Sequence, residues 1–232
     1  MAVQIVVLIN PIPDLGKASL SKSQATLFEK GPRIMDPSDR NALEFALQIR
    51  EKGGQWNAAA GKVTVTTLML APSDCESILK ETLALEADQA VLLSDPAFQG
   101  GDDVAVAVAL ARAVSKLKAD LTLSGAGIVG HRVAEEMKIP SVVSVSGITF
   151  NEGRLQITTE DRPGPLKVSL PLLASVLAGS NTPRIANAIK IMKAAKREVL
   201  KWTPADLNLA TEEVGPAASG IARTRSFLPE SG

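Results

Sequence analysis

Three glycines near the middle of the chain have a spacing that is typical of phosphate binding. Gly125, Gly127 and Gly130 form a Gly-x-Gly-x-x-Gly pattern after the apolar run Leu121–Leu123, and a segment of helical period follows them. Glycine lets the backbone approach a phosphate closely, and the free N–H groups at the start of a helix bind anions. The chemistry that these residues could perform is therefore the binding of a phosphate.

The position of the pattern argues against a dinucleotide-binding dehydrogenase. In that fold the glycines lie in the first turn from strand to helix, and an acidic residue about 20 residues later binds the ribose. Here they follow the fourth expected core strand, and the first acidic residue beyond the next helix is Glu152, at an expected hairpin turn. Two interpretations stay open: glycines that only let a strand and a helix pack closely, and a phosphate site in another α/β nucleotide fold.

Few other side chains could carry acid–base or metal chemistry. His131 is the only histidine, tyrosine is absent, and Cys75 is the only cysteine. These counts exclude a disulfide framework and a Cys/His zinc site. Basic and acidic residues balance at 25 each, so no net charge attracts nucleic acid or an anionic membrane. We expect a carrier or binding subunit with no catalytic residue and no metal.

Apolar runs alternate with segments of helical period along most of the chain. The first, VQIVVLI, is too short to span a membrane and lacks a basic flank, so we expect a buried strand and a cytoplasmic protein. Strands that are apolar on both faces are typical of parallel sheets covered by helices. We expect them at Val3–Ile9, Val63–Leu70, Ala90–Leu93, Leu121–Leu123 and Leu170–Leu177. Helices are expected after Ser38 or Asp39, Pro72 or Ser73, Asp102 or Asp103, and Gly127. The predicted fold is α/β, an open and mostly parallel sheet with helices on both faces.

The pattern changes in the second half of the chain. Val142–Phe150 and Arg154–Glu160 flank a turn, and Leu166–Leu173 returns, which predicts an antiparallel excursion over residues 142–173. A basic helix is expected from Pro183 to Lys201. The residues from Trp202 are rich in proline, glycine and alanine. We therefore expect two parts: an α/β nucleotide-binding-like domain over 1–201, and an arm over 202–232 that docks on a partner subunit or stays mobile.

Five segments in order carry a resemblance to a known family. They are IMDPSDRNALEFALQIREKGG (34–54), SDPAFQGGDD (94–103), LPLLASV (170–176), TPRIANAIKIMKAAKREVLKWTPADL (182–207) and RSFLPE (225–230). Together they resemble the β subunit of electron transfer flavoproteins, in the style of the nitrogen-fixation-associated and flavin-bifurcating branches. The resemblance implies a heterodimer whose α subunit carries FAD and passes electrons between a dehydrogenase and a downstream acceptor such as a quinone reductase. It also implies AMP, or in bifurcating members a second FAD, in this subunit.

The resemblance also implies where a nucleotide would bind. The matching positions are Ile9, Asn10, Pro11, Asp36, Leu70, Gly125, Gly127, Ile128, Val129, Gly130 and Arg132. The family's longer glycine loop, with its acidic and glutamine residues, is shortened here to Gly125–Gly130. The family's hydroxyl residues after Asp102 are replaced in DDVAVA by Asp103, Val106 and Ala107. We therefore expect at most a mononucleotide in this subunit and no second flavin.

A turn before Pro183 is the expected docking loop for client proteins. The family's exposed leucine, which anchors client dehydrogenases, falls at Ser180 in the loop Gly179, Ser180, Asn181 and Thr182. A serine in place of leucine removes the apolar side chain that would anchor a client protein, so either the client differs or the complex with it is permanent. The other interpretation is that these residues form a plain surface turn. Two other functions stay open: an adenine-nucleotide-binding regulatory module without a redox role, and a nucleotide hydrolase or ligase.

Overall fold

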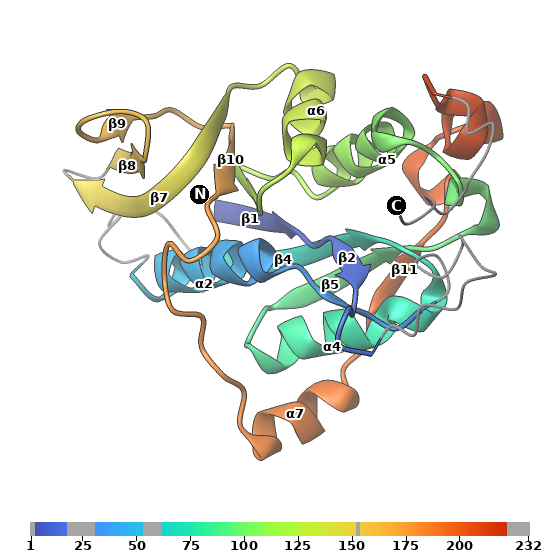
Figure 1. The fold of residues 1–232 in the computed structure, drawn as a ribbon, viewed down its shortest axis with the longest axis horizontal. Helices are drawn as coiled ribbons and strands as arrows, with labels where there is room; N and C mark the ends of the chain where they lie inside the picture. The colour runs from blue at the N-terminus through green and yellow to red at the C-terminus, as the bar shows by residue number, and fades with distance from the viewer. Residues whose placement is uncertain (1–2, 18–30, 53–61, 152–153, 222–232) are drawn as a thin grey trace, which may run out of the picture.

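A nine-stranded sheet with helices on both faces makes up most of the molecule (Figure 1). The structure, a computed structural model, describes residues 3–17, 31–52, 62–151 and 154–221. The sheet runs in the order β11-β5-β4-β1-β6-β10-β7-β8-β9. Its strands are β1 (Val3–Leu8), β4 (Val63–Leu70), β5 (Gln89–Leu93), β6 (Leu121–Ser124), β7 (Ser141–Asn151), β8 (Arg154–Thr159), β9 (Leu166–Lys167), β10 (Leu172–Val176) and β11 (Leu200–Trp202). The predicted α/β fold and its five core strands are confirmed.

Among the described residues, four α-helices cover the sheet and a fifth projects from the body (Figure 1), and a small second sheet lies beside the main one. The helices are α2 (Pro37–Glu51), α4 (Glu76–Ala84), α5 (Asp103–Lys116), α6 (Ile128–Met137) and α7 (Ala188–Ala195). The second sheet pairs β2 (Pro11–Pro13) with β3 (Arg33–Met35) in antiparallel register. Among the described residues, no helix combines the length and the apolar character that crossing a membrane requires.

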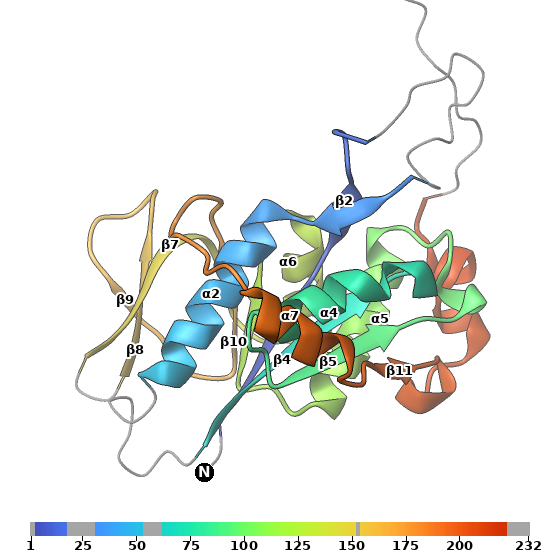
Figure 2. The same ribbon diagram turned by 90° about the horizontal axis from the view of Figure 1, so that it is seen from below.

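The central strand β1 shows how the sequence builds two hydrophobic layers. Ile5 and Val7 belong to the cluster that β1 shares with α2 and α4, whereas Val6 and Leu8 belong to the cluster shared with α5 and α6. Successive side chains of a strand point to opposite faces, so a strand that is apolar throughout needs cover on both sides. Figure 2 shows α2, α4 and α7 in front of the sheet, with α5 and α6 behind.

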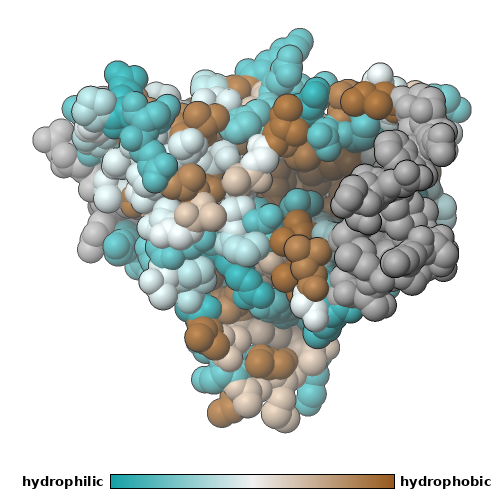
Figure 3. Space-filling view, in the orientation of Figure 1, coloured by the Kyte–Doolittle hydropathy of each residue, from teal (hydrophilic) through white to brown (hydrophobic). Residues whose placement is uncertain are grey.

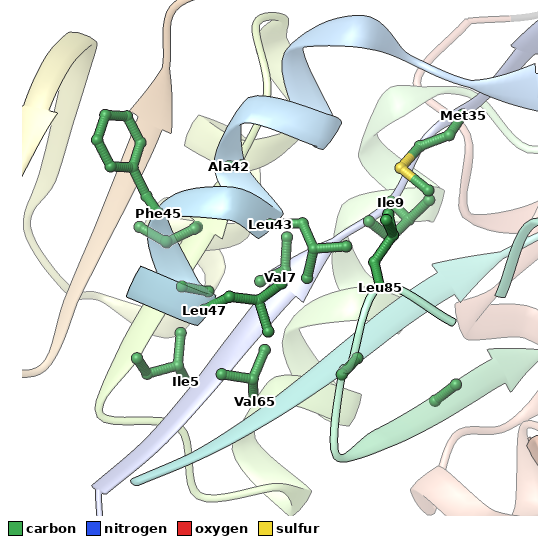
Figure 4. Close-up of a cluster of buried hydrophobic side chains, with 14 of the residues drawn as sticks. Ile5, Val7, Ile9, Met35, Ala42, Leu43, Phe45, Leu47, Val65 and Leu85 are labelled. Atoms are coloured by element: carbon green, nitrogen blue, oxygen red, sulfur yellow. The ribbon is translucent and has the colours of Figure 1, made fainter. Parts of the chain in front are cut away.

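Helix α2 carries much of the first layer. Ala42, Phe45, Ala46 and Ile49 are buried along one face, as their spacing predicts. Figure 4 shows Leu43 and Leu47 of the same helix beside Val7 of β1 and Val65 of β4. The cap of this helix is not Ser38 or Asp39, as expected, but Asp36, whose carboxylate accepts a hydrogen bond from the Ser38 N–H at 2.8 Å. Pro37 at the first helical position favours this start, because its missing N–H is not needed there.

The topology reverses direction next to β1. From β1 the chain passes through α2 to β4 and then β5 on one side, and it returns through α5 to β6 on the other side. All of these pairs are parallel. The loops that leave β1 and β6 therefore lead to helices on opposite faces, and the crevice between them is the usual ligand position in open α/β sheets.

The expected antiparallel excursion is present and grows out of the parallel sheet. The first half of β7 pairs with β10 in parallel, and its second half pairs with β8 in antiparallel register. The short β9 adds to β8 at the edge of the sheet. One long strand thus joins the core sheet to a hairpin that lies to one side of it (Figure 1).

The expected helix from Pro183 to Lys201 is much shorter in the structure. Helix α7 covers only Ala188–Ala195, because the Asn187 side chain caps it by accepting from the Lys190 N–H at 2.9 Å. The Arg197 guanidinium donates to the carbonyls of Ala87 and Asp88, which draws the following residues to the open edge of β5. There Leu200–Trp202 pairs in parallel as β11, a strand that helical periodicity did not predict.

The first part of the expected arm packs on the α/β domain. Residues 202–221 contain three short 3-10 helices, Ala205–Leu207, Thr211–Glu213 and Gly215–Ala218. Leu207, Leu209 and Val214 are buried in the layer that contains α5. Asp102 fastens the far end: its Oδ1 caps α5 and its Oδ2 accepts from the N–H groups of Gly220 and Ile221. The arm also contains three apolar residues that we expect to anchor it on a partner: Ile221 is exposed, whereas Phe227 and Leu228 lie outside the described residues.

Candidate functional site

A cavity of about 100 Å³ lies in the crevice where the loops after β1, β4 and β6 meet. Most of the residues expected at a nucleotide site line it, namely Ile9, Asn10, Pro11, Leu70, Gly125, Gly127, Ile128, Val129 and Gly130. Asp36 and Arg132 do not. The lining also includes Asp39, Ser124 and Ala126, together with Leu8, Val106 and Leu110. The glycine pattern and the ends of two other strands thus form one site.

The three glycines serve packing and conformation in different ways. Gly127 has φ +124°, the left-handed region that favours glycine, and a Cβ there would meet open space. A Cβ on Gly125 would collide with the Ser38 hydroxyl and the Asp39 carboxylate, and one on Gly130 would collide with the Ser124 hydroxyl. Close packing therefore explains Gly125 and Gly130, and it brings polar side chains against the loop that was expected to meet a phosphate.

The start of α6 can bind an anion. Gly127 caps the helix without any side-chain hydrogen bond, so the first N–H groups of α6 have no partner from the cap. The Ser124 hydroxyl lies beside Gly130, is buried, and has no hydrogen-bond partner among the described residues. Aligned N–H groups and an unpaired hydroxyl are what a phosphate oxygen requires.

Two side chains from α2 bridge the crevice, a pair that we call the Ser38–Asp39 clamp. Asp39 Oδ2 accepts from the Asn10 N–H at 2.6 Å, and Oδ1 accepts from the Gly125 N–H at 2.7 Å. Ser38 Oγ accepts from the Ala126 N–H at 2.9 Å. The clamp therefore occupies backbone donors that a bare loop would have offered to a ligand, and the donors that remain belong to α6.

Sequence reasoning missed the clamp because it treated Ser38 and Asp39 as alternative helix caps. A usable signal was present: Asp36, Ser38 and Asp39 are three capping-type residues at one helix start, and only one residue can be the cap. The other two are then free to reach other loops. Asp39 is 3% exposed, so its carboxyl is within the protein and not on the surface.

The burial of Asp39 changes its acidity. The pKa of its carboxyl is raised to about 7, chiefly by burial, which outweighs the lowering by the hydrogen bonds from Asn10 and Gly125; the nearby Asp36 carboxylate raises the pKa as well. A carboxyl with this pKa exchanges its proton near neutral pH. It is also the one ionisable side chain among the residues that line the cavity.

Two expected site residues have other places in the structure. Asp36 binds the Ser38 N–H at 2.8 Å and the Ser38 hydroxyl at 2.5 Å, so it supports the clamp from outside the cavity. Arg132 is on α6 beyond the lining, and its buried Nε has no hydrogen-bond partner in the part of the chain that the structure describes. On the remaining wall, Val106 and Leu110 of α5 present apolar side chains.

The expected docking loop is held by paired amides. Asn41 Oδ1 accepts from the Gly179 N–H at 2.9 Å, and Asn41 Nδ2 donates to the Asn181 carbonyl and to Asn181 Oδ1, each at 2.8 Å. Asn181 Nδ2 donates back to the Asn41 carbonyl at 2.9 Å. The Ser180 hydroxyl is buried without a partner among the described residues. These contacts fix residues 179–181 to α2.

An ion-pair group continues this attachment toward α7. The Arg184 guanidinium forms two hydrogen bonds with the Glu44 carboxylate, at 2.8 and 3.1 Å, and one with Glu51 at 2.6 Å. Burial alone would raise the pKa of Glu44, but the hydrogen bonds from Arg184 and Gln48 outweigh it and lower the pKa. Beyond it α7 projects from the body, and Figure 3 shows apolar side chains at this tip. The exposed ones are Ile185, which precedes α7, and Ile189, Ile191 and Met192 on the helix.

Comparison with known proteins places the chain among its relatives. A family model for the electron transfer flavoprotein domain matches residues 25–207. The electron transfer flavoprotein subunit beta of Thermoanaerobacterium thermosaccharolyticum is 35% identical over 98% of this chain and 88% of its own length. The caffeyl-CoA reductase-Etf complex subunit CarD of Acetobacterium woodii is 32% identical over 97% of this chain and 88% of its own. Protein FixA of Sinorhizobium fredii is 30% identical over 97% and 83%. The regulatory module without a redox role finds no support among these relatives, and the chain belongs to the electron transfer flavoprotein family, with β subunits as its relatives.

Proposed function

We propose that this chain pairs, as a β subunit, with an α subunit that carries FAD, and that the pair passes electrons between a dehydrogenase and a downstream acceptor such as a quinone reductase. The similarity to β subunits over nearly the whole chain carries this proposal. The FAD supplies the redox chemistry when bound. The residues of this chain scaffold the flavin-bearing subunit and line one edge of the flavin, and they perform no bond chemistry.

The cavity at the start of α6 holds the phosphate of a mononucleotide such as AMP. The first N–H groups of α6 and the unpaired Ser124 hydroxyl fit a phosphate. The apolar wall of Val106 and Leu110 offers no hydrogen-bond partner to the polar edge of a second flavin. These features favour a mononucleotide and not FAD in this subunit.

The loop Gly179–Thr182 is the contact for client proteins. Its attachment to Asn41 presents it in one conformation, so a partner loses little entropy in ordering it. Because position 180 is serine and not leucine, this contact is polar or the complex is permanent. The arm over 202–232 docks on the α subunit, and the exposed apolar side chain of Ile221 supports this docking.

Nucleotide content of the purified complex tests the cofactor assignment. The full chain is co-expressed with its α subunit, the complex is denatured, and the released FAD and AMP are quantified. We expect a yellow complex with a single FAD per heterodimer and AMP as the other nucleotide. Ser124→Ala should reduce the AMP content and leave the FAD content unchanged, because it removes the unpaired hydroxyl of the cavity.

Ser146→Ala is the matched control, since the Ser146 hydroxyl lies on β7, donates to the Thr158 carbonyl and is outside the cavity lining. It should leave both contents unchanged. Two FAD per heterodimer would contradict the mononucleotide assignment, and a colourless complex would contradict the electron-transfer role.

A further inference from the structure

The charges around the cavity do not match those of an ordinary phosphate site. Among the residues that line it, the one ionisable side chain is the acidic Asp39, and no lysine, arginine or histidine is present. Phosphate sites commonly supply a positive side chain to offset the ligand. Here the positive end of the α6 dipole, roughly half an elementary charge, is the offset that the lining provides.

An anion in this cavity would therefore face a carboxylate in a poorly solvated place. The cavity has a volume of only about 100 Å³, and Asp39 is 3% exposed, so water screens the two negative charges weakly. Like charges that share such a site are disfavoured, and the usual outcome is that one of them binds a proton. The anion and the ionised form of Asp39 thus compete.

The surroundings of Asp39 allow the protonated form. Its partners from the loops after β1 and β6 are the N–H groups of Asn10 and Gly125, which are neutral donors. The charged group that acts on it is Asp36, a second negative charge at the start of its own helix, and this favours protonation. His131 and Arg132 of α6 lie outside the cavity lining. The pKa of about 7 agrees with this geometry.

We propose that Asp39 makes the cavity a proton-linked anion site, in which a phosphate group binds together with one proton that the Asp39 carboxyl takes up. The proposal rests on the proposed function, because it concerns the same cavity, and it adds the regulation of that site by pH. The proton comes from solvent and resides on Asp39 while the anion is bound. Rising pH then releases the anion without any change in the α6 donors.

Sulfate is the probe, because it has the size and charge of a phosphate group and does not titrate between pH 6 and 9. The full chain, labelled with nitrogen-15, is titrated with sodium sulfate, and the backbone amide signals of Gly127, Ile128, Val129 and Gly130 report binding at the site. We expect the affinity to be nearly constant below pH 7 and to fall about tenfold for each pH unit above it, as one linked proton requires.

Two variants of neighbouring carboxyls separate the proton linkage from a general charge effect. Asp39→Asn removes the titrating group, so its sulfate affinity should be independent of pH. Asp36→Asn removes a negative charge that lies outside the lining, so it should keep the tenfold slope and move its onset to lower pH. Amide spectra of both variants without sulfate establish that each is folded.

The outcomes distinguish the two proposals. Sulfate binding to the wild type without pH dependence, or the same slope in Asp39→Asn, would overturn the proton linkage and leave the phosphate site standing. No shift of the α6 amides with either sulfate or AMP, in wild type or Asp39→Asn, would overturn the site and the linkage together. Binding of AMP no tighter than sulfate at pH 9, with the slope intact, would support the linkage and contradict the nucleotide assignment.

Discussion

Replacement of Asn41 by alanine tests how the docking loop is held to α2. The Asn41 side chain is buried, with 4% of its surface exposed, and it makes three hydrogen bonds to the loop. Alanine leaves the Gly179 N–H and the Asn181 carbonyl without these partners. The bond from Asn181 Nδ2 to the Asn41 carbonyl is made by the backbone and remains available.

The expected cost follows from the number of bonds and their burial. A hydrogen bond contributes about 1 kcal/mol net, and a buried group left without a partner costs about 1–3 kcal/mol. Solvent can reach part of the loop and replace some of these partners, so we expect Asn41→Ala to lower the free energy of unfolding by about 2–4 kcal/mol. Asn181→Ala removes two side-chain bonds nearer the surface and should cost about 1–2 kcal/mol.

Urea denaturation of the two single variants and the double variant measures these values in one cycle. One bond, from Asn41 Nδ2 to Asn181 Oδ1, is lost in both single variants. The double variant should therefore cost about 1 kcal/mol less than the sum of the singles. A cost below about 0.5 kcal/mol for Asn41→Ala, or full additivity, would refute the inference that these amides fix the loop.

Three further predictions concern other parts of the structure. Gly125→Ala should destabilise the fold by about 2–4 kcal/mol in urea denaturation, because its Cβ would collide with the Ser38–Asp39 clamp. Gly127→Ala should cost only about 1–2 kcal/mol, from backbone strain. Equal costs for the two variants would contradict this prediction. The folded protein keeps the Asp39 proton up to about pH 7 and the unfolded chain releases it near pH 4, so the stability that Asp39 contributes is fully present below about pH 4 and is lost as the pH rises through 7. Urea denaturation at several pH values checks this by measuring the free energy of unfolding of the wild type and of Asp39→Asn. A difference between these two free energies that does not vary with pH would contradict the prediction. A chain that ends at Ile221 should still fold but fail to co-purify with the α subunit; an intact complex would show that the residues beyond do not dock.

The strands of the core sheet were predictable because short runs of consecutive apolar residues indicate strands that are buried on both faces. A run such as Ile5–Leu8, apolar and buried at every position, fits a strand covered on both faces. The cavity was predictable for a related reason: glycines between a strand and a helix mark a close turn at the carboxyl edge of the sheet. The family resemblance then assigned Ile9, Asn10, Pro11 and Leu70 by position, but it did not assign Ser124 or Asp39.

The features that were missed depend on contacts between distant segments. Leu200–Trp202 becomes a strand because the edge of β5 is open beside it, and its own residues continue a helical period. From the local sequence Asp39 is a candidate helix cap, and its actual role depends on the N–H groups of Asn10 and Gly125, which donate to its carboxylate. Local propensity cannot predict either feature, since the partner that decides the structure is far away in the sequence.

The strand order has a consequence for how the chain reaches its fold. Strand β10 lies between β6 and β7, although both of them precede it in the sequence. During synthesis β6 and the β7–β8 hairpin leave the ribosome first, and neither can pair with the other in the native sheet. Until β10 inserts, each presents an unpaired edge that can join the strands of another molecule. Insertion of β10 therefore closes the two edges in one step, and assembly of the sheet has to wait for it.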